Sequence, residues 1–312
     1  MEYEYINRYV QRKKRDVELS TLNQYKDTLI RFMELMRKRI KVNTEEELYK
    51  SIDNNVLEDF YFEYEETHKK SCYNRSVSIV RSFFDYLVED KGLIPFNPYG
   101  RIKGYKPMEV LEDTKEKEVL TREELQQFIR ALDIYTYGSK GFIFTSTRDK
   151  FLFTLMASTG VRVERLLEAK LSDVILKDTY AILVIPKDKK LNKERYIPIS
   201  GKCYKYFTHY LTLRKKMSGD YLFLSYRDEK LTKAGVNKNI KKTLEKAHID
   251  KHITNHCFRH YANNQLKANG TPEYTIKYIL GWSSKDMMNT YYDHYTNEFE
   301  RSLVSATAKI IA

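Results

Sequence analysis

The chain has few of the residues that cross-link or interrupt a fold. Its three cysteines, Cys72, Cys203 and Cys257, lie far apart among 312 residues, and no CxxC pair occurs. An odd, scattered set indicates reduced thiols of a cytosolic protein and argues against a disulfide framework or a zinc site. With only 11 glycines and 6 prolines beside abundant Lys, Glu, Tyr and Leu, the composition predicts a mainly helical chain.

Long apolar runs are also lacking. No run of about 18 apolar residues is present to span a bilayer, and the first twenty residues have no apolar signal core. We therefore expect a cytoplasmic protein with no membrane partner. What the chain does have is 55 Lys and Arg against 43 Asp and Glu. The net charge of +12 favours a polyanionic partner, although charge alone does not separate DNA from RNA or acidic lipid.

The first third of the sequence predicts a small all-helical domain. Apolar residues recur at helical spacing from Thr21 to Leu87, and one helix is expected through Val56–Tyr64. Two prolines in the stretch 91–100 signal a turn that ends this block. We assign residues 1–100 to the helical domain. The charged stretch 101–118 has no helical stripe and is expected to be a linker.

Residues 119–312 predict a second domain that mixes helices with a small β-sheet. A capping box at Thr121–Glu124 starts its first helix, and another helix is expected through Phe151–Ala157. Two β-like runs, Thr179–Pro186 and Arg195–Ser200, are joined by a lysine-rich turn as a hairpin. The predicted fold class is mainly α with a small β-sheet.

Arg162 is the first candidate for a chemical role. Gly160 ends one expected helix and Arg162 opens the next, so the arginine lies near a helix N-terminus, where anions bind. Its planar guanidinium can hold two phosphate oxygens at once. The alternative is a surface arginine paired with a nearby glutamate.

His256 and Arg259 are the next candidates. Residues three apart share a helix face, so both side chains can converge on one point while Phe258 and Tyr261 face the core. A metal site at His256 and His260 is the rival interpretation, but the motif is not HExxH and no third ligand is evident. A structural or surface role is the other alternative.

The hairpin tip and the single tryptophan supply further hydrogen-bond donors. A lysine at the tip can protonate a leaving oxygen, and the candidates are Lys187, Lys189, Lys190 and Lys193. For most of them a solvated basic turn is the alternative. Trp282 has an indole N–H suited to a phosphate oxygen, with a core tryptophan as its alternative.

Tyr291 and Tyr292 are candidate nucleophiles for attack on a phosphodiester. Any one of the 26 tyrosines is far more often packing than chemistry. A nucleophilic phenol needs cationic neighbours that stabilise developing phenolate character, and Arg162, Arg259 and a lysine would supply them.

Together and in this order, the motifs resemble the tyrosine recombinase/integrase superfamily of phage integrases and Xer-like recombinases. TGVR followed by AKLSDV resembles the first arginine box, and IPKDKKLNKERYIPI resembles the lysine hairpin K-x-x-K-x-R-x-x-P. HCFRHYANNQLKANG resembles HxLRHxxA…G, and LGWSS with YDH resembles LGHSS with Y-x-H. The N-terminal block is similar to the family's helical, SAM-like core-binding domain, so the resemblance covers most of the chain.

The resemblance implies a site-specific DNA recombinase or integrase with a mixed α/β catalytic domain. Such an enzyme cleaves and rejoins double-stranded DNA at attachment sites through a 3′-phosphotyrosyl intermediate, with no metal, ATP or cofactor. It implies a homotetramer on DNA with weaker self-association when free, and accessory DNA-bending factors as further candidate partners. The other functions considered are a type IB topoisomerase, a telomere-resolving enzyme and a catalytically impaired DNA-binding accessory protein.

The family's roles carry over to matching positions. Arg162 and Arg259 are expected to bind the non-bridging phosphate oxygens and stabilise the transition state. His256 is expected to act as base or proton-positioning group. Trp282 is expected to donate a hydrogen bond where many members use histidine.

Two assignments have alternatives. Counting back from Pro198 in the usual register gives Lys190 as the general acid, with Lys187 or Lys189 as alternatives because the hairpin is long. The Y-x-H signature gives Tyr292 as the nucleophile, and the commonest spacing from the Trp282 position gives Tyr291. Tyr292 is preferred.

One position departs from the family, and one segment has two interpretations. Members usually carry an acidic residue three after the first arginine, where this chain has Arg165. Either Glu164 or Glu168 takes over the acidic role or the pocket is organised differently. The tail Phe299–Ala312 is expected to be a helix that packs on a neighbouring protomer, as in family relatives, or on its own domain.

Overall fold

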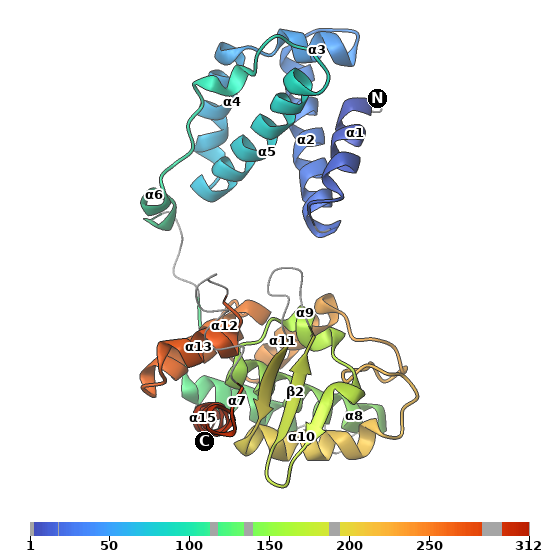
Figure 1. Cartoon of the computed structure of the whole chain (residues 1–312), viewed down its shortest axis with the longest axis vertical. Coiled ribbons are helices and arrows are strands. Elements are labelled where there is room, and N and C mark those ends of the chain that lie inside the picture. Colours follow the sequence, from blue (N-terminus) through green and yellow to red (C-terminus); the bar gives the residue numbers. More distant parts are fainter. Residues whose placement is uncertain are drawn as a thin grey trace. The chain divides into compact units, whose positions relative to one another are not determined.

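The computed structural model describes residues 3–17, 19–112, 118–133, 140–186, 194–282 and 295–311. The chain divides into two compact units, Met1–Glu116 and Lys117–Ala312 (Figure 1). Six candidate residues lie outside the described residues: Lys187, Lys189, Lys190, Lys193, Tyr291 and Tyr292. The candidate site is therefore built below from Arg162, His256, Arg259, Trp282 and their neighbours.

The described part of the first unit is entirely helical. Its helices are α1 (Glu4–Lys13), α2 (Leu19–Arg39), α3 (Glu45–Ser51), α4 (Asn54–Thr67), α5 (Lys70–Glu89), the 3-10 turn η1 (Pro98–Gly100) and α6 (Pro107–Glu112). α4 confirms the helix expected through Val56–Tyr64. Helix α5 is the centre of the core, because Val80, Phe83, Phe84 and Leu87 are fully buried.

The turn after α5 follows from its polar residues as much as from its prolines. Asn97 accepts a hydrogen bond from the Tyr99 backbone N–H and donates to the Arg81 carbonyl oxygen, which ties the turn back onto α5. Further on, α6 lies within the stretch expected to be a linker. Pro107 begins this helix, and Glu109 accepts from the Lys106 backbone N–H at 2.6 Å. A helix of only six residues closed by such a cap needs no apolar stripe, so periodicity did not predict it.

The second unit combines helices with one small sheet. Its described elements are α7 (Arg122–Ala131), α8 (Lys140–Thr159), α9 (Val163–Glu168), η3 (Leu171–Asp173), β1 (Val174–Leu176), β2 (Ala181–Ile185), β3 (Arg195–Ile199), α10 (Gly201–Arg214), α11 (Lys233–Lys246), α12 (Asn255–Ala268), α13 (Glu273–Leu280), α15 (Asn297–Ala308) and η4 (Lys309–Ile311). The capping box predicted for α7 is confirmed: Thr121 Oγ1 accepts from the Glu124 N–H, and Glu124 accepts from the Thr121 N–H.

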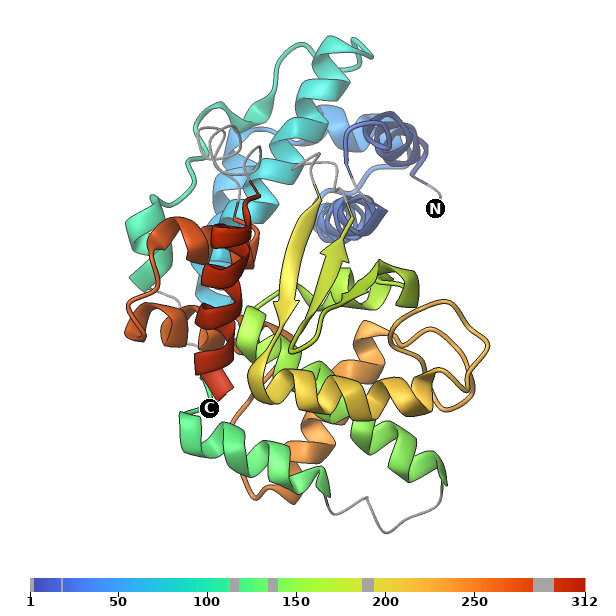
Figure 2. The same cartoon turned by 60° about the horizontal axis from the view of Figure 1, so that its bottom comes forward.

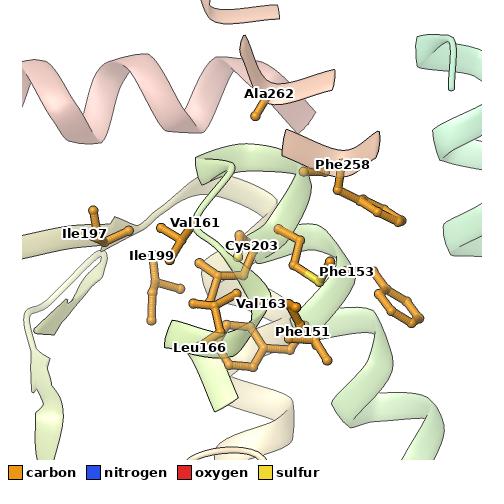
Figure 3. Packing of buried hydrophobic residues seen from close by; sticks show 14 of the residues in the cluster. Phe151, Phe153, Val161, Val163, Leu166, Ile197, Ile199, Cys203, Phe258 and Ala262 are labelled. Atoms are coloured by element: carbon orange, nitrogen blue, oxygen red, sulfur yellow. The ribbon is translucent and has the colours of Figure 1, made fainter. Parts of the chain in front are cut away.

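Helix α8 runs through the centre of the second unit. Every residue of its last stretch, from Phe151 to Thr159, is buried, so this part of the helix is enclosed on all sides. Figure 3 shows part of the cluster around it, with Phe153 close to Phe258 of α12; these two rings stack at 5.7 Å. This packing holds the α8 C-terminus, where the first candidate arginine follows, against helix α12.

The sheet has three antiparallel strands in the order β1-β2-β3. Strands β2 and β3 confirm the predicted hairpin, with Ile185 opposite Arg195 as the pair nearest its tip. β1 was not predicted, because three half-exposed residues are too short for an alternating pattern. Pro198 is accommodated because β3 is an edge strand, where a missing N–H breaks no ladder.

The C-terminal helix α15 packs on its own unit, beside β3 (Figure 2). Leu303 and Ile310 are fully buried in the core, and Ser200 Oγ lies 2.8 Å from Thr307 Oγ1. In this structure of a single chain, the segment therefore packs on its own domain, which is the second of the two interpretations. Among the described residues, no helix is both long and apolar enough to cross a membrane.

Candidate active site

Arg162 is placed by a turn that only glycine fits. Gly160 ends α8 with φ +60°, and a Cβ there would lie 2.4 Å from Leu280 Cδ2 and 3.0 Å from Ala262 Cβ. This close approach brings the turn against α12 and α13. Arg162 is the N-cap residue of α9 and is exposed to solvent. The sequence prediction of an arginine at a helix N-terminus is confirmed.

Arg259 joins three separate parts of the chain. Its Nη1 donates to the carbonyl oxygen of Gly160 at 2.7 Å and to that of Leu280 at 2.6 Å. Its Nη2 is buried and finds no hydrogen-bond acceptor among the described residues. A buried donor of this kind is costly unless a further acceptor is bound. Nη1 of Arg259 therefore stabilises the fold, while Nη2 can donate to a bound anion.

Positive charge is concentrated at this point. Burial, followed by the nearby charges of Arg162 and Arg195, lowers the pKa of Arg259 to about 10. The group is still protonated near neutral pH, so three cationic guanidinium groups share one region. A bound anion would relieve both their repulsion and the unpaired donor of Arg259.

His256 lies in the first turn of α12, exposed, three residues before Arg259. As predicted, Phe258 and Tyr261 are buried and face the core. His260 follows on the same helix, half-buried. In the described part of the chain, no group of three or more His, Cys, Asp or Glu side chains is arranged to hold a metal ion.

Trp282 follows the left-handed Gly281 (φ +66°) that caps α13. The residue is 39% exposed, so it is not a core tryptophan, and the Arg259 guanidinium carbon lies 5.9 Å from its ring centroid. This is a cation–π distance. Trp282 therefore borders the same region as Arg259, at the point where the chain enters residues 283–294.

The acidic residues near Arg165 are not equivalent. Glu164 forms an ion pair with Lys233 of α11, and Glu168 forms one with Lys230 at 2.6 Å. Burial raises the pKa of Glu164, but the hydrogen bond from Lys233, a backbone hydrogen bond of Glu164 itself and the nearby charges of Lys233 and His256 together outweigh it, so the net shift is downward. Of the two candidates for the displaced acidic role, Glu164 is the one that interacts electrostatically with His256.

Arg195 was not among the predicted site residues. It is the first residue of β3 and only 3% exposed, and its Nη1 donates to the carbonyl oxygens of Tyr278 and Ile279. The available signal was the arginine of the motif K-x-x-K-x-R-x-x-P. A sequence pattern does not distinguish a buried arginine from a solvated one. The contact of Arg195 with the end of α13 could therefore not be predicted from the sequence.

The predicted lysine and nucleophile can be located only by the elements that flank them. Residues 187–193, with Lys187, Lys189 and Lys190, connect β2 to β3. Residues 283–294, with Tyr291 and Tyr292, connect Trp282 to the start of α15. Their assignments stay predictions.

Comparison with known proteins identifies the family. Residues 118–298, more than half of the chain, match the phage integrase family. Tyrosine recombinase XerC of Halalkalibacterium halodurans is 29% identical over 244 residues, covering 75% of each chain. Tyrosine recombinase XerD of the same organism is 26% identical over 279 residues, covering 88% of this chain and 86% of the relative.

Solved structures share the fold. A XerH site-specific recombinase bound to palindromic difH substrate superposes with a TM-score of 0.71 at 19% identity, covering 97% of this chain and 84% of that one. A lambda integrase (75-356) dimer bound to a COC' core site gives 0.66 at 17% identity, covering 95% and 96%.

The family match defines a DNA strand-cleaving and rejoining enzyme of the tyrosine type. The chain belongs to the phage integrase family, and its function is that of a site-specific tyrosine recombinase. The family and fold predicted from the sequence are confirmed. The comparisons do not favour the topoisomerase, telomere-resolving or accessory-protein alternatives.

Proposed function

We propose that the cleavage step joins Tyr292 to the scissile phosphate of double-stranded DNA. The phenol oxygen attacks phosphorus while the bond to the 5′ oxygen breaks, which leaves a 3′-phosphotyrosyl link and a free 5′-hydroxyl. Lys190 gives its proton to the departing 5′ oxygen, and His256 takes or positions the proton of the phenol. Attack by the 5′-hydroxyl of a partner strand reverses the step, so phosphodiester bond energy is retained without ATP.

In this proposal Arg162 and Arg259 hold the non-bridging oxygens, and Trp282 donates a further hydrogen bond. The observation that carries it is the buried Arg259 Nη2, which has no acceptor within the part of the chain that the structure describes, beside the exposed Arg162. Donors fixed by the fold and aimed at one point stabilise developing charge with little reorganisation. The Gly160 and Leu280 carbonyls supply that fixation at Arg259.

The assembly is proposed on the same basis. We expect residues 1–100 to act as the core-binding domain and residues 119–312 as the catalytic domain, with both contacting the duplex around an attachment site. Phosphate contacts would position the protein and fewer base contacts would select the site. Strand exchange between two duplexes requires four protomers, so we propose a tetramer on DNA, acting in the cytoplasm, with accessory DNA-bending factors as candidate partners.

The test uses nicked suicide duplexes, drawn from a library with randomised flanks because the attachment site is unidentified. Wild-type protein should form an SDS-resistant DNA adduct, and mass spectrometry should place the DNA on Tyr292. Tyr292→Phe should abolish the adduct, while the matched Tyr291→Phe variant should retain it. Lys190→Ala and Lys187→Ala, compared on a 5′-phosphorothiolate that needs no general acid, should show rescue of Lys190→Ala alone.

The outcomes separate the assignments from the reaction. An adduct in both phenylalanine variants, or a different modified residue, would overturn the nucleophile assignment. Loss of the adduct in the Tyr291 variant alone would transfer the role to that residue. EDTA is expected to leave the adduct yield unchanged, and a loss restored by added divalent metal would contradict the metal-independent mechanism.

A further inference from the structure

Arg195 links the lysine hairpin to the turn that precedes the candidate nucleophile. The residue forms the last ladder pair of the hairpin, opposite Ile185. Its buried side chain donates from Nη1 to the carbonyl oxygens of Ile279 at 3.1 Å and Tyr278 at 3.4 Å, at the C-terminal end of α13. The contact therefore joins the β2–β3 hairpin, which carries the candidate lysines, to the end of α13, after which the candidate nucleophiles follow in the sequence.

The guanidinium of Arg195 is packed closely against this turn. A Cβ added at Gly281 would lie 2.3 Å from Arg195 Nη1 and 2.5 Å from Cζ. Gly281 thus serves two needs, since its φ of +66° ends the helix and its missing side chain makes room for Arg195. The residue after it is Trp282.

A second arginine completes the cap. The carbonyl oxygen of Leu280 accepts from Arg259, so three consecutive carbonyls of α13 receive N–H groups from two arginines, Arg195 buried and Arg259 half-buried. Cations at a helix C-terminus interact favourably with its unsatisfied carbonyls. This arrangement brings the charge of Arg195 close to Arg259, although Arg195 itself is buried.

We infer that Arg195 is a positioning residue for DNA cleavage, which holds the Gly281–Trp282 turn at a fixed place relative to the lysine hairpin. The inference rests on the proposed function, because it assigns the nucleophile to the segment after Trp282 and the general acid to the segment before Glu194. In this inference Arg195 acts by fixing the Gly281–Trp282 turn relative to the hairpin and by placing its charge beside Arg259. It does not touch the DNA. A shift of about 1 Å between reacting groups lowers a rate by about 100-fold, so a rigid link between the two segments matters to catalysis.

A neutral hydrogen bond between the same two elements provides a matched control. The Tyr196 backbone N–H donates to Tyr278 Oη at 3.0 Å, also joining β3 to α13. Tyr278→Phe removes this link and leaves the guanidinium cap in place. Arg195→Met removes the cap with little change in volume, and Arg195→Lys keeps the charge but loses the planar fork.

The experiment measures single-turnover cleavage of the suicide duplex at saturating DNA, the half-saturating DNA concentration, and the thermal midpoint of each full-length variant. Arg195→Met should cleave about 100-fold more slowly and Arg195→Lys about 10-fold more slowly. Half-saturation should change by less than about threefold. Tyr278→Phe should cleave within about threefold of wild type even if its midpoint falls as far as that of Arg195→Lys.

Three outcomes would overturn the inference. One is an Arg195→Lys variant that is folded and cleaves like wild type. Another is a set of cleavage rates that follow thermal midpoints alone, Tyr278→Phe included, which would make the role merely structural. The third is a loss confined to DNA affinity. Failure of the proposed function has a different signature, because Tyr292→Phe would then still form the adduct whatever Arg195 does.

Discussion

The side chain of Arg259 donates to the backbone of Gly160, 99 residues earlier in the chain, at 2.7 Å. This bond ties the turn that presents Arg162 to the helix that presents His256. The same nitrogen holds the Leu280 carbonyl, and so the turn before Trp282. Arg259 therefore has a structural side and a chemical side, and the two can be separated by experiment.

The first prediction compares the two candidate phosphate-binding arginines. Arg162→Ala should lower the cleavage rate by about 100- to 1,000-fold while leaving stability nearly unchanged, because the side chain is exposed. Arg259→Ala should lower cleavage at least as much, and should also cost about 1–3 kcal/mol, because two carbonyl oxygens lose their donor. Thermal denaturation of both variants beside the adduct assay makes the comparison.

A drop of about 2–12 °C in the thermal midpoint is expected for Arg259→Ala, given about 2–4 °C per kcal/mol in a unit of this size. Arg259→Lys is the control variant that keeps the positive charge but is not expected to make both hydrogen bonds to the Gly160 and Leu280 carbonyls. Equal destabilisation by Arg162→Ala and Arg259→Ala would show that the two arginines do not divide their roles in this way.

The second prediction concerns anion binding in the absence of DNA. Arg162, Arg195 and Arg259 repel one another, and Arg259 Nη2 has no acceptor in the described ranges, so inorganic phosphate should bind and stabilise the fold. At ten times its Kd the gain is about 1.4 kcal/mol. The measurement is the thermal midpoint against phosphate concentration, with sodium chloride at matched ionic strength.

Phosphate also stabilises proteins in general by exclusion from their surfaces, so the decisive quantity is the difference between variants. Arg162→Ala should lose most of the saturable part of the response and keep the part that is linear in concentration. Identical responses in wild type and Arg162→Ala would argue against a phosphate site at these arginines.

Local signals accounted for the parts of the fold that were predicted. The capping box at Thr121 and Glu124, the β2–β3 hairpin and the shared face of His256 and Arg259 all depend on residues close in sequence. Short elements were not predicted, because they have too few residues to show a hydrophobic period. Strand β1 and helix α6 are examples, formed by ladder pairing and by a cap.

The unpredicted part of the site depends on contacts between distant residues. Arg195 and the carbonyls of α13 are more than 80 residues apart, and no spacing rule relates a strand residue to a helix end at that separation. The same holds for Glu164, whose partner Lys233 lies on another helix. From the sequence alone, Glu164 and Glu168 were equal candidates for the acidic role. Only the tertiary fold shows that Glu164 interacts electrostatically with His256.

The third prediction follows from that difference. Because the pKa of Glu164 is lowered in the folded state, its carboxylate contributes stability above the unfolded value of about 4.5, and this contribution is lost as pH falls through the lower folded pKa. The difference in unfolding free energy between wild type and Glu164→Gln should be present at pH 7 and should close in acid below that folded value. Urea unfolding at a series of pH values measures it.

His256 gives the matching readout at the site. Removing the negative charge of Glu164 should lower the imidazole pKa of His256, since the carboxylate favours the protonated ring. Glu168→Gln is the control, because it breaks a comparable surface ion pair, with Lys230, one turn along the same helix. An NMR titration in which both variants shift His256 equally, or neither does, would remove Glu164 from the acidic role.

The final prediction tests where the C-terminal helix packs. Leu303 is fully buried against its own unit, whereas its neighbour Val304 is only partly buried. Leu303→Ala should cost about 2–5 kcal/mol and Val304→Ala about 1 kcal/mol. If the helix belongs to its own chain in the free protein, the wild-type thermal midpoint should not change over a 100-fold range of protein concentration, because no association is linked to folding. A midpoint that rises with concentration, lost in Leu303→Ala, would mean instead that the helix is exchanged between protomers before DNA is bound.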